Sequence, residues 1–326
     1  MREIGVVAAD GIQVISMAAL TAFDLANSEL GEPGYRIRFM SVSGGEVPSS
    51  FGFPVVTEPL SRRMPDTVIV VGQVVRRPPA PAVLDYLRRA RQEARRVASI
   101  CNGAFVLAAS GLLDGRLATT HWARVQALQE QFPAVRVTDE RIYTEDDGIW
   151  TSAGMSAGID LALALIEQDH GPRLAGAVAR RMVLYHRRPG GQTQHSALLD
   201  IAPRSDRVQR VLAHVRENLS RPLGVEDLAE VARLSPRQFS RVFREETGMS
   251  PARAVERLRL EAAKTMMETG RHPLDVIARD SGFADRDRMR RAFLRVHGHA
   301  PRALAGQDRP AGSTPGRDVE GASGAR

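Results

Sequence analysis

The only cysteine of the chain, Cys101, lies in a stretch whose pattern suits a reactive side chain. Residues 95–110 (RRVASICNGAFVLAAS) predict a strand, a turn that holds Cys101, and a helix that follows at once. Such a turn exposes the thiol at the carboxyl edge of a sheet, where open sheets bind ligands, and the helix N–H groups favour a thiolate. His121 follows a Thr119-Thr120 segment that can return to this edge. A nucleophile and its base therefore form one hypothesis.

Arginines on a short helix form a second candidate site. Residues 225–251 (VEDLAEVARLSPRQFSRVFREETGMSP) predict a helix, a sharp turn and a second helix. Ser235, followed by Gln238 three residues later, has the pattern of a capping box, and Pro236 suits the first helical position. The 3/4 spacing turns three apolar residues inward, Phe239, Val242 and Phe243. It leaves four residues on the outer face, Arg237, Ser240, Arg241 and Arg244. A helix of this kind fits the major groove of DNA.

The same pattern recurs later in the chain, at an offset of 49 residues before the turn and 50 after it. Ile277-Ala278 repeats Leu228-Ala229, and Met289 repeats Phe239. A repeated helix-turn-helix is far more specific than a single match. Between the copies, residues 252–268 predict a continuous helix with one apolar stripe, made of Ala254, Leu258, Ala262 and Met266. A rigid helix here would hold two recognition helices for successive major grooves, roughly 34 Å apart.

The charge of the chain also indicates DNA binding. The 326 residues give room for two domains, and 43% of them are hydrophobic, enough for real cores. The formal net charge is +7, and residues 204–304 hold 21 Arg and Lys against 14 Asp and Glu, so the whole surplus lies there. A basic module beside a neutral one is typical of DNA binding, although a solvated arginine-rich surface is the alternative. We expect neither a membrane span nor a signal peptide, and one cysteine fits a reducing cytoplasm.

Strands that alternate with helices predict an α/β fold for the first part of the chain, with an open, mostly parallel sheet covered by helices on both faces. The predicted strands are 4–8, 35–42, 67–71, 97–100, 135–137, 142–144 and 149–151. The predicted helices are 12–30, 81–95, 103–110, 156–168 and 173–185. An all-α domain with the two helix-turn-helix motifs follows. We therefore expect a ligand-sensing and dimerisation domain at 1–186, a linker at 187–206, a DNA-binding domain at 207–304 that opens with helix 207–219, and a disordered tail at 305–326.

Two families come into view from these residues. Residues 205–304 resemble the AraC/XylS-type regulators in their paired motifs, their linker helix and their closing signature, GFADRDRMRRAFLRVHGHAP. The first part resembles the ThiJ/PfpI family, whose flavodoxin-like fold is like that of class I glutamine amidotransferases, at the Cys101 turn, at His121-Trp122 and at 150–160 (WTSAGMSAGID). With the segment RPGGQ (188–192), the whole of 1–304 is similar to GlxA-type transcriptional regulators.

The resemblance assigns roles to the arginines. Base-reading positions of the AraC type correspond to Arg237, Ser240 and Arg241 in the first motif. In the second motif we expect base contacts from Arg286, Asp287, Arg290 and Arg291, because arginine can bridge O6 and N7 of guanine. We expect phosphate contacts, which position the protein without specifying a sequence, from Arg244, Arg288 and Arg295. A solvated surface charge is the alternative for each of them.

Two departures from the ThiJ/PfpI enzymes argue against catalysis. Those enzymes carry an acidic residue that faces the cysteine, and this chain has Ile15 at the matching position. The residue after the cysteine is often histidine in the enzymes, and here it is Asn102. Cys101 is then a buried hydrophobe that closes a turn, the wall of a ligand pocket, or a nucleophile. We expect a ligand pocket that includes Cys101, Asn102, His121 and Ile15, and we expect no catalytic residue. For His121, the alternative to a role as a base is that of a hydrogen-bonded structural histidine.

Three functions fit this chain. The favoured one is a transcriptional regulator whose partners are double-stranded promoter DNA, an unknown small-molecule effector, a second copy of the chain and, if it activates, RNA polymerase. The alternatives are a cysteine-dependent hydrolase or lyase of the ThiJ/PfpI type with a helical appendage, and a DNA-binding protein whose first domain only dimerises. We expect no cofactor, because Gly44-Gly45 and Gly190-Gly191 predict turns and not a phosphate-binding loop. We expect no metal, because His297 and His299 have no Cys or Asp cluster beside them.

Overall fold

A computed structural model describes residues 1–72, 77–184, 188–191, 194, 205–268, 272–297 and 300. The chain divides into two compact units. The amino unit is Met1–Asp206 with Glu245–Gly248, and the helical unit is Arg207–Arg244 with Met249–Arg326. The tail 305–326, most of the expected linker and His299 lie outside the described residues. No helix within the described ranges is long and apolar enough to cross a membrane.

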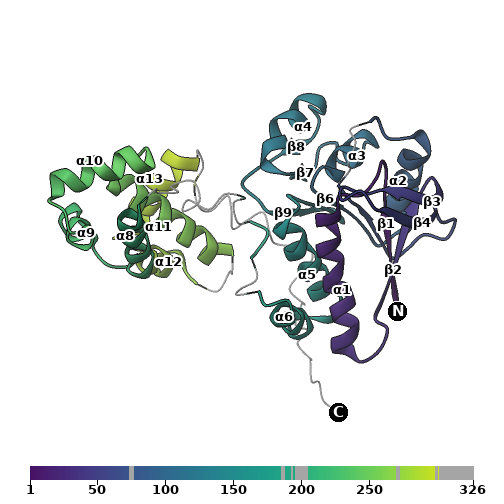
Figure 1. Cartoon of the computed structure of the whole chain (residues 1–326), viewed down its shortest axis with the longest axis horizontal. Coiled ribbons are helices and arrows are strands. Elements are labelled where there is room, and N and C mark those ends of the chain that lie inside the picture. The colour runs from purple at the N-terminus through teal and green to yellow at the C-terminus, as the bar shows by residue number, and fades with distance from the viewer. Residues whose placement is uncertain are drawn as a thin grey trace, which may run out of the picture. The chain divides into compact units, whose positions relative to one another are not determined.

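The described part of the amino unit is built on an eight-stranded sheet, most of whose strands are labelled in Figure 1. In spatial order its strands are β3 (Ser43–Pro48), β4 (Pro54–Pro59), β2 (Tyr35–Ser41), β1 (Arg2–Val7), β5 (Thr67–Val70), β6 (Arg96–Ile100), β10 (Ile149–Ser152) and β9 (Tyr143–Asp146). The six inner strands are parallel, and β3 and β9 run antiparallel to their neighbours at the two edges. Two short strands, β7 (Leu117–Ala118) and β8 (Arg136–Val137), pair in a separate parallel sheet.

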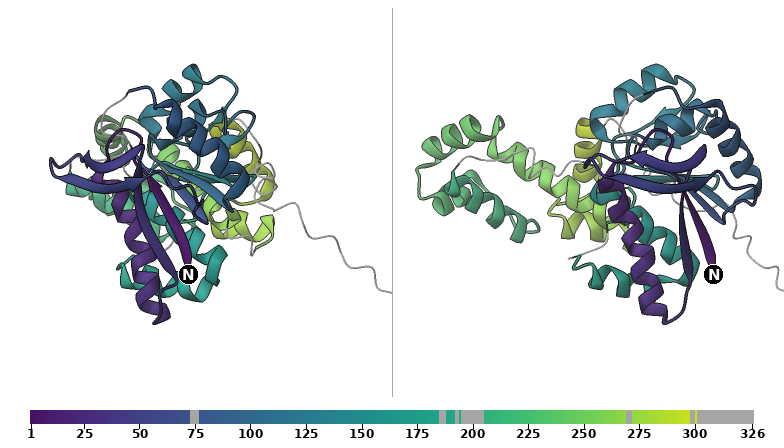
Figure 2. Two further views of the ribbon diagram at one scale, coloured as in Figure 1. Left: turned by 90° about the vertical axis from the view of Figure 1, so that its right-hand side faces the viewer. Right: turned by 45° about the vertical axis from the view of Figure 1, so that its right-hand side comes forward.

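Helices cover both faces of the large sheet (Figure 2). One face packs against α1 (Met17–Leu30), α5 (Ser156–His170) and α6 (Pro172–Arg181). The other packs against α2 (Pro81–Glu93), α3 (Gly103–Ala109) and α4 (Val125–Gln131). Side chains along a strand alternate between the two cores, so that Ile69 of β5 joins the first and Val68 the second. The predicted α/β architecture is confirmed.

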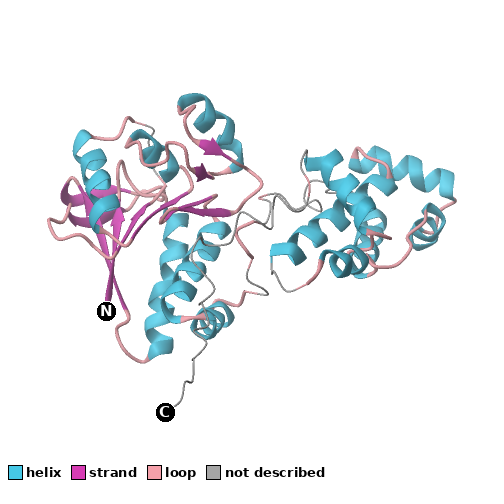
Figure 3. Cartoon of the chain, turned by 180° about the vertical axis from the view of Figure 1, so that it is seen from behind, coloured by secondary structure: helices cyan, strands magenta, loops and turns pink. Residues whose placement is uncertain are grey.

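The described elements of the helical unit are all helices, as Figure 3 shows. They are α8 (Asp206–Glu217), α9 (Val225–Ala232), α10 (Pro236–Thr247), α11 (Pro251–Glu268), α12 (Leu274–Asp280) and α13 (Arg286–His297). The pairs α9–α10 and α12–α13 are the two helix-turn-helix motifs, and α11 is the continuous helix between them. The predicted all-α domain with two motifs is therefore confirmed.

The structure differs from the sequence-based expectation at one edge of the sheet. Gly44 and Gly45, expected in a turn, lie inside β3 with φ angles of +72° and +82°. The antiparallel hairpin of β3 and β4 was not predicted, because β3 is mostly exposed and lacks an apolar period. The helix expected from residue 12 also begins later, with η1 (Val14–Ser16), because Ile12 is extended and bridges to Ser49.

The apolar stripe of α11 is wider than predicted. Ala254 and Leu258 are buried as expected, but Ala262 and Met266 are only partly buried. Leu260, Ala263 and Met267 are buried instead, in a cluster with the core of the second motif. A helix that buries residues on more than one side cannot be described by a single stripe.

Candidate functional site

The two helix-turn-helix motifs repeat one another down to single hydrogen bonds. The Leu234 N–H donates to the Ala229 carbonyl at 3.0 Å, and 49 residues later the Phe283 N–H donates to the Ala278 carbonyl at 2.8 Å. The buried core residues also correspond, Phe239 with Met289 and Phe243 with Phe293. These bonds end each first helix in the same way and set the direction in which the second helix leaves.

The extra residue of the second turn can be placed from the helix caps. The Ser235 hydroxyl accepts from the Gln238 N–H at 3.4 Å, while the Gln238 side chain accepts from the Ser235 N–H at 3.4 Å, so the predicted capping box is present. Fifty residues after Ser235, the Asp285 carboxylate accepts from the Arg288 N–H at 2.7 Å. The added residue therefore lies directly before Asp285, at Ala284.

The outer face of α10 carries the expected polar residues. Arg237, Arg241 and Arg244 are exposed, and Ser240 is partly buried. The opposite face is held by Phe239 and Phe243, whose rings pack edge to face at 5.4 Å, whereas Val242 is only partly buried. The arginines thus stand on a helix that is anchored by two aromatic side chains.

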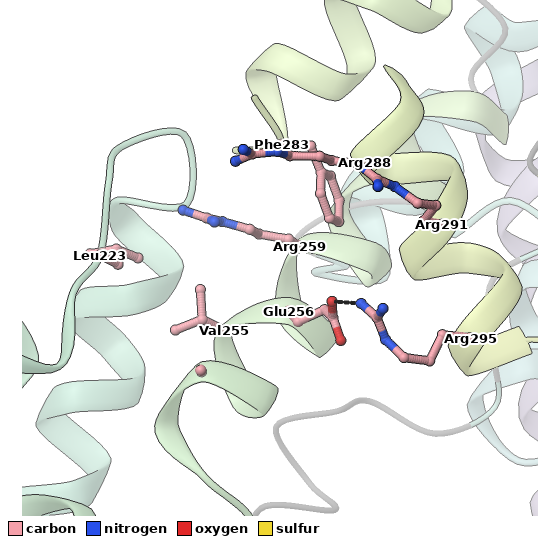
Figure 4. A pocket seen from close by; sticks show the side chains of 9 residues that line it. Leu223, Val255, Glu256, Arg259, Phe283, Arg288, Arg291 and Arg295 are labelled. Atoms are coloured by element: carbon pink, nitrogen blue, oxygen red, sulfur yellow. Dashed lines mark hydrogen bonds and ion pairs between the residues drawn. The ribbon is translucent and has the colours of Figure 1, made fainter. Parts of the chain in front are cut away.

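On α13, three arginines line one groove of about 430 Å³, drawn in Figure 4. Arg288, Arg291 and Arg295 are spaced by three and four residues, which places them on one side of the helix. Glu256 and Arg259 face them from α11. The structure thereby groups Arg291, expected to read bases, with two arginines expected to bind phosphates.

The groove has an excess of positive charge. Its lining has four guanidinium groups against the single carboxylate of Glu256, which pairs with Arg295. Arg259 donates to the carbonyls of Leu219, at 3.1 Å, and Arg221, at 2.7 Å, and so also holds the segment after α8. An anion such as a phosphate is attracted to a concave basic surface of this kind.

The other polar residues expected to bind DNA lie outside this groove. Arg286 and Arg290 are four residues apart on a neighbouring stripe of α13, and Arg286 lies 3.6 Å from Asp275. Asp287 is exposed, and its carbonyl accepts from Arg291 Nε at 3.3 Å. The second motif therefore presents two basic stripes with an acidic residue between them.

In the amino unit, Cys101 occupies the turn between β6 and α3, as predicted. Its φ of +57° is unusual for a residue other than glycine. The Cys101 N–H donates to the Ser152 carbonyl at 3.0 Å, and its carbonyl accepts from the Thr120 hydroxyl at 2.9 Å. A Cβ on Gly154 would overlap the Cys101 side chain, so the two segments approach closely. The Thr119-Thr120 segment does return to this edge of the sheet.

The thiol is buried, contrary to the expectation that the turn would expose it. Cys101 is 6% exposed. Burial raises the pKa of the Cys101 thiol, and it outweighs the Asn102 N–H and the charge of Arg124, both of which lower that pKa. The N–H at the start of α3 does favour the thiolate, as predicted, but burial is the larger contribution and the pKa is raised on balance.

The other residues of the expected ligand pocket lie in different surroundings. Asn102 lines a cavity of about 500 Å³ in the amino unit. His121 caps η2 (Trp122–Arg124), where its Nδ1 accepts from the Ala123 N–H at 3.3 Å, and its ring lies 5.4 Å from the Trp122 ring. Ile15 lies in η1 and is 43% exposed. Of the four, Asn102 is in the wall of this cavity.

Two family models match the chain: the DJ-1/PfpI family at residues 6–168 and a helix-turn-helix domain at 228–307. The chain is 33% identical over 294 residues to the HTH-type transcriptional regulator CdhR of Pseudomonas aeruginosa. The aligned region covers 86% of each protein. The chain is 30% identical over 314 residues to the HTH-type transcriptional regulator GlxA of Rhizobium meliloti. The aligned region covers 93% of this chain and 95% of that protein. The chain belongs to this family of HTH-type transcriptional regulators with a DJ-1/PfpI domain.

A solved structure supports the fold of the regulator. The crystal structure of an AraC family transcriptional regulator from Pseudomonas putida matches 56% of this chain and 100% of its own, with a TM-score of 0.51 and 20% identity. At that identity the likeness concerns the fold alone. The resemblance to GlxA-type regulators that was predicted from the sequence is confirmed by the family matches.

The start of the expected linker makes contacts in the regulator that the sequence analysis missed. Arg188 donates from its backbone and side chain to the buried Asp160 of α5, at 3.0 Å, 2.9 Å and 2.6 Å. The Gln194 amide donates to the Thr119 hydroxyl at 2.9 Å and to the Thr120 carbonyl at 2.8 Å. The signal available in the sequence was an aspartate inside an otherwise apolar helical stretch, because a buried carboxylate needs a partner.

The raised pKa and burial of Cys101 predict a slow thiol in the regulator. Iodoacetamide reacts with thiolates, so we expect the folded protein at neutral pH to be alkylated on the order of tenfold or more slowly than the urea-unfolded chain. The rate should rise with pH as the thiol ionises. Mass spectrometry measures it directly, because the chain has one cysteine. Equal rates for folded and unfolded protein would contradict the assignment.

Proposed function

We propose that this protein is a sequence-specific transcriptional regulator that reads two short elements in successive major grooves of promoter DNA. The observation that carries the proposal is the repeated helix-turn-helix, with matched caps and with exposed arginines on both second helices. The continuous helix α11 joins the two motifs. In this arrangement Arg237, Ser240 and Arg241 read one element, and Arg286, Asp287, Arg290 and Arg291 read the other.

We further propose that the amino unit senses a small metabolite and does no chemistry. A buried thiol with a raised pKa is a poor nucleophile, and Ile15 replaces the acid that the related enzymes use. The unit also pairs two copies of the chain, and if the regulator activates transcription, it contacts RNA polymerase. Because its proposed target is promoter DNA, we place its action in the cytoplasm.

The contacts of Arg188 and Gln194 support a route from sensor to linker. Thr120 holds the Cys101 carbonyl through its hydroxyl and receives Gln194 at its own carbonyl. A ligand that moves the Cys101 turn would therefore act on the residues from which the linker starts. Such coupling needs different ligand affinities in two conformations of the protein.

A selection from random DNA duplexes tests the proposed function. At about 150 mM salt, nonspecific phosphate binding is weakened. Enrichment of two short elements about one helical turn, roughly 34 Å, apart is the expected result. Uniform, salt-sensitive binding without enrichment would reject sequence-specific regulation and leave the helical unit as a nonspecific anchor.

Arg291 and Arg295 should differ in their effects on DNA binding. Arg291→Ala should flatten the preference for one element, with a loss of about 1–3 kcal/mol of discrimination if the guanidinium bridges a guanine. Arg295→Ala should weaken all duplexes alike and reduce the slope of log K against log salt by about 1. Fluorescence anisotropy with the selected and a scrambled duplex, at several salt concentrations, measures both quantities.

Arg279→Ala is the matched control for these two variants. Arg279 is an exposed arginine of the same unit, on α12, and it pairs with Asp280 outside the groove. It should bind both duplexes like the wild type. If Arg291→Ala and Arg295→Ala instead weaken the two duplexes equally, both arginines contact phosphates, and the base-reading role of Arg291 is wrong.

A further inference from the structure

The cavity of about 500 Å³ lies among α2, α3 and α4, on one face of the sheet of the amino unit. Its volume lies within the roughly 300–1,000 Å³ typical of small-molecule sites. The apolar part of its wall includes Leu84, Phe105 and Phe132. Arg77 and Arg124 supply its charges, and no acidic side chain is among the described residues that line it. The lining therefore combines positive charge with an apolar surface.

Arg124 is held in a defined position in this wall. Its guanidinium carbon lies 5.5 Å from the centre of the Phe105 ring. The Phe105 and Phe132 rings pack edge to face, 6.5 Å apart. The side chain is partly buried, and a charge beside apolar groups attracts an opposite charge more strongly than it does in open solvent.

We propose that this cavity binds the effector of the regulator, and that the effector is a small carboxylate with an apolar body. The carboxylate pairs with Arg124 and Arg77, since guanidinium groups match carboxylates in geometry as well as charge. The apolar body packs against Phe132 and Leu84. This inference rests on the proposed sensing function and adds the chemical class of the ligand.

The cavity adjoins the Cys101 turn. Asn102 lines the cavity, and its backbone N–H, like the charge of Arg124, lowers the pKa of the Cys101 thiol. A bound carboxylate would screen Arg124 and so reduce the fraction of thiolate. Alkylation of Cys101 should therefore slow when the cavity is filled, which gives a local readout of occupancy.

Calorimetric titration of the full chain with ligands of one shape and different charge tests the proposal. The probes are benzoate, phenylacetate and hexanoate, each with its primary amide as the uncharged counterpart, and with benzylammonium, phenethylammonium and hexylammonium as the respective cationic counterparts. We expect at least one carboxylate to bind, and its amide and ammonium counterparts to bind about tenfold or more weakly. Inorganic phosphate, which lacks an apolar body, should also bind more weakly.

Variants locate the binding. Arg124→Gln should weaken carboxylate binding about tenfold or more, and Arg77→Gln should weaken it less, because Arg77 is exposed. Arg136→Gln is the matched control, because Arg136 is an exposed arginine of β8 outside the cavity. It should bind like the wild type. If Arg124→Gln does not fold, as judged by tryptophan fluorescence, Arg77→Gln takes its place.

The possible results separate the ligand class from the DNA function. Equal binding of carboxylate and amide, wild-type affinity in Arg124→Gln, or no binding by any of the three carboxylates would overturn this inference. If the duplex selection still enriches an operator in that case, the regulator function stands and only the ligand class falls. If a carboxylate binds through Arg124 but no operator is enriched, the proposal of sequence-specific DNA binding is rejected and the proposed carboxylate site is retained.

Discussion

Asp169→Ala should lower the free energy of unfolding of the amino unit by about 3–5 kcal/mol, the loss typical of a buried ion pair that loses one partner. The Asp169 side chain is fully buried, and the Arg96 side chain beside it is 2% exposed. Arg96 Nη1 donates to Oδ1 at 2.9 Å, Arg95 lies 2.7 Å from the same oxygen, and the Tyr35 hydroxyl donates to Oδ2 at 2.8 Å. Without the carboxylate, a desolvated guanidinium loses its counter-charge, and that penalty dominates the loss.

Urea unfolding followed by tryptophan fluorescence measures this loss in the amino unit alone. Both tryptophans, Trp122 and Trp150, lie in that unit. Asp147→Asn is the control, because Asp147 also pairs with two arginines, at 2.6 Å and 2.9 Å, but is 60% exposed, and asparagine tolerates its left-handed φ of +51°. Its loss should be about 0–1 kcal/mol. Similar losses in the two variants would show that burial of the pair does not control its contribution.

The same carboxylate gives the stability a pH dependence of known sign. Burial alone would raise the pKa of Asp169, but the hydrogen bonds and charge of Arg96 outweigh burial and hold that pKa below its ordinary value. A group whose pKa is lower in the folded state contributes fully above its unfolded pKa, about 3.9, and loses that contribution as pH falls through the folded pKa. The difference between wild type and Asp169→Ala should therefore be constant down to about pH 4 and shrink below it.

Local periodicity explains which parts of the fold could be predicted. Residues 68–70 are all apolar, and the strand β5 to which they belong is buried on both faces, as a strand of this kind must be. The edge strand β3 has no such period, so the sequence alone predicted a turn at Gly44-Gly45. Arg96 also shows that a local pattern cannot predict a long-range contact. A charged residue at the start of a strand is typical of a surface, and only the fold brings it to Asp169, 73 residues away.

In the candidate sites too, features set by local sequence could be predicted, and features that depend on tertiary packing could not. The two helix-turn-helix motifs could be predicted because their signals, caps and 3/4 spacing, act within a few residues. The grouping of Arg291 with Arg288 and Arg295 could not, because it depends on how α13 packs beside α11. The turn at Cys101 was predicted from a strand, a turn and a helix, but the close approach of Gly154 and the Thr120 hydrogen bond to the Cys101 carbonyl come from residues distant in sequence.

Gly282→Ala should abolish specific DNA binding and leave the amino unit intact. Gly282 is the left-handed residue that ends α12, with a φ of +86°, and its counterpart 49 residues earlier is Arg233, with a φ of +55°. A left-handed conformation costs a residue other than glycine roughly 1–2 kcal/mol, which the first motif tolerates at Arg233. At Gly282 an added Cβ would also overlap the Leu219 carbonyl oxygen, which accepts from Arg259 Nε at 3.1 Å. The turn or the segment after α8 must then move, and we expect a total loss of about 4 kcal/mol or more.

Gly248→Ala separates the cost of a left-handed backbone conformation from the cost of the steric overlap. Gly248 ends α10 with a φ of +72°, but a Cβ there would meet no heavy atom within 4 Å. This control should lose only the conformational part, roughly 1–2 kcal/mol, and should still bind the selected duplex. Circular dichroism follows the unfolding of the helical unit, and anisotropy follows DNA binding. The tryptophan transition of the amino unit should be unchanged in Gly282→Ala, which lies in the helical unit.

The comparison also decides whether both motifs are needed to read DNA. If Gly282→Ala loses its helical transition but keeps wild-type preference for both elements, the second motif does not read sequence, and the arginines of α13 only attract the backbone. If it keeps preference for one element alone, each motif reads its own site. Complete loss of specific binding, with Gly248→Ala unaffected, means that one motif holds too few contacts to select an operator against nonspecific DNA. That last outcome is the one we expect, because matching hydrogen bonds at the ends of the two first helices present both second helices in the same way.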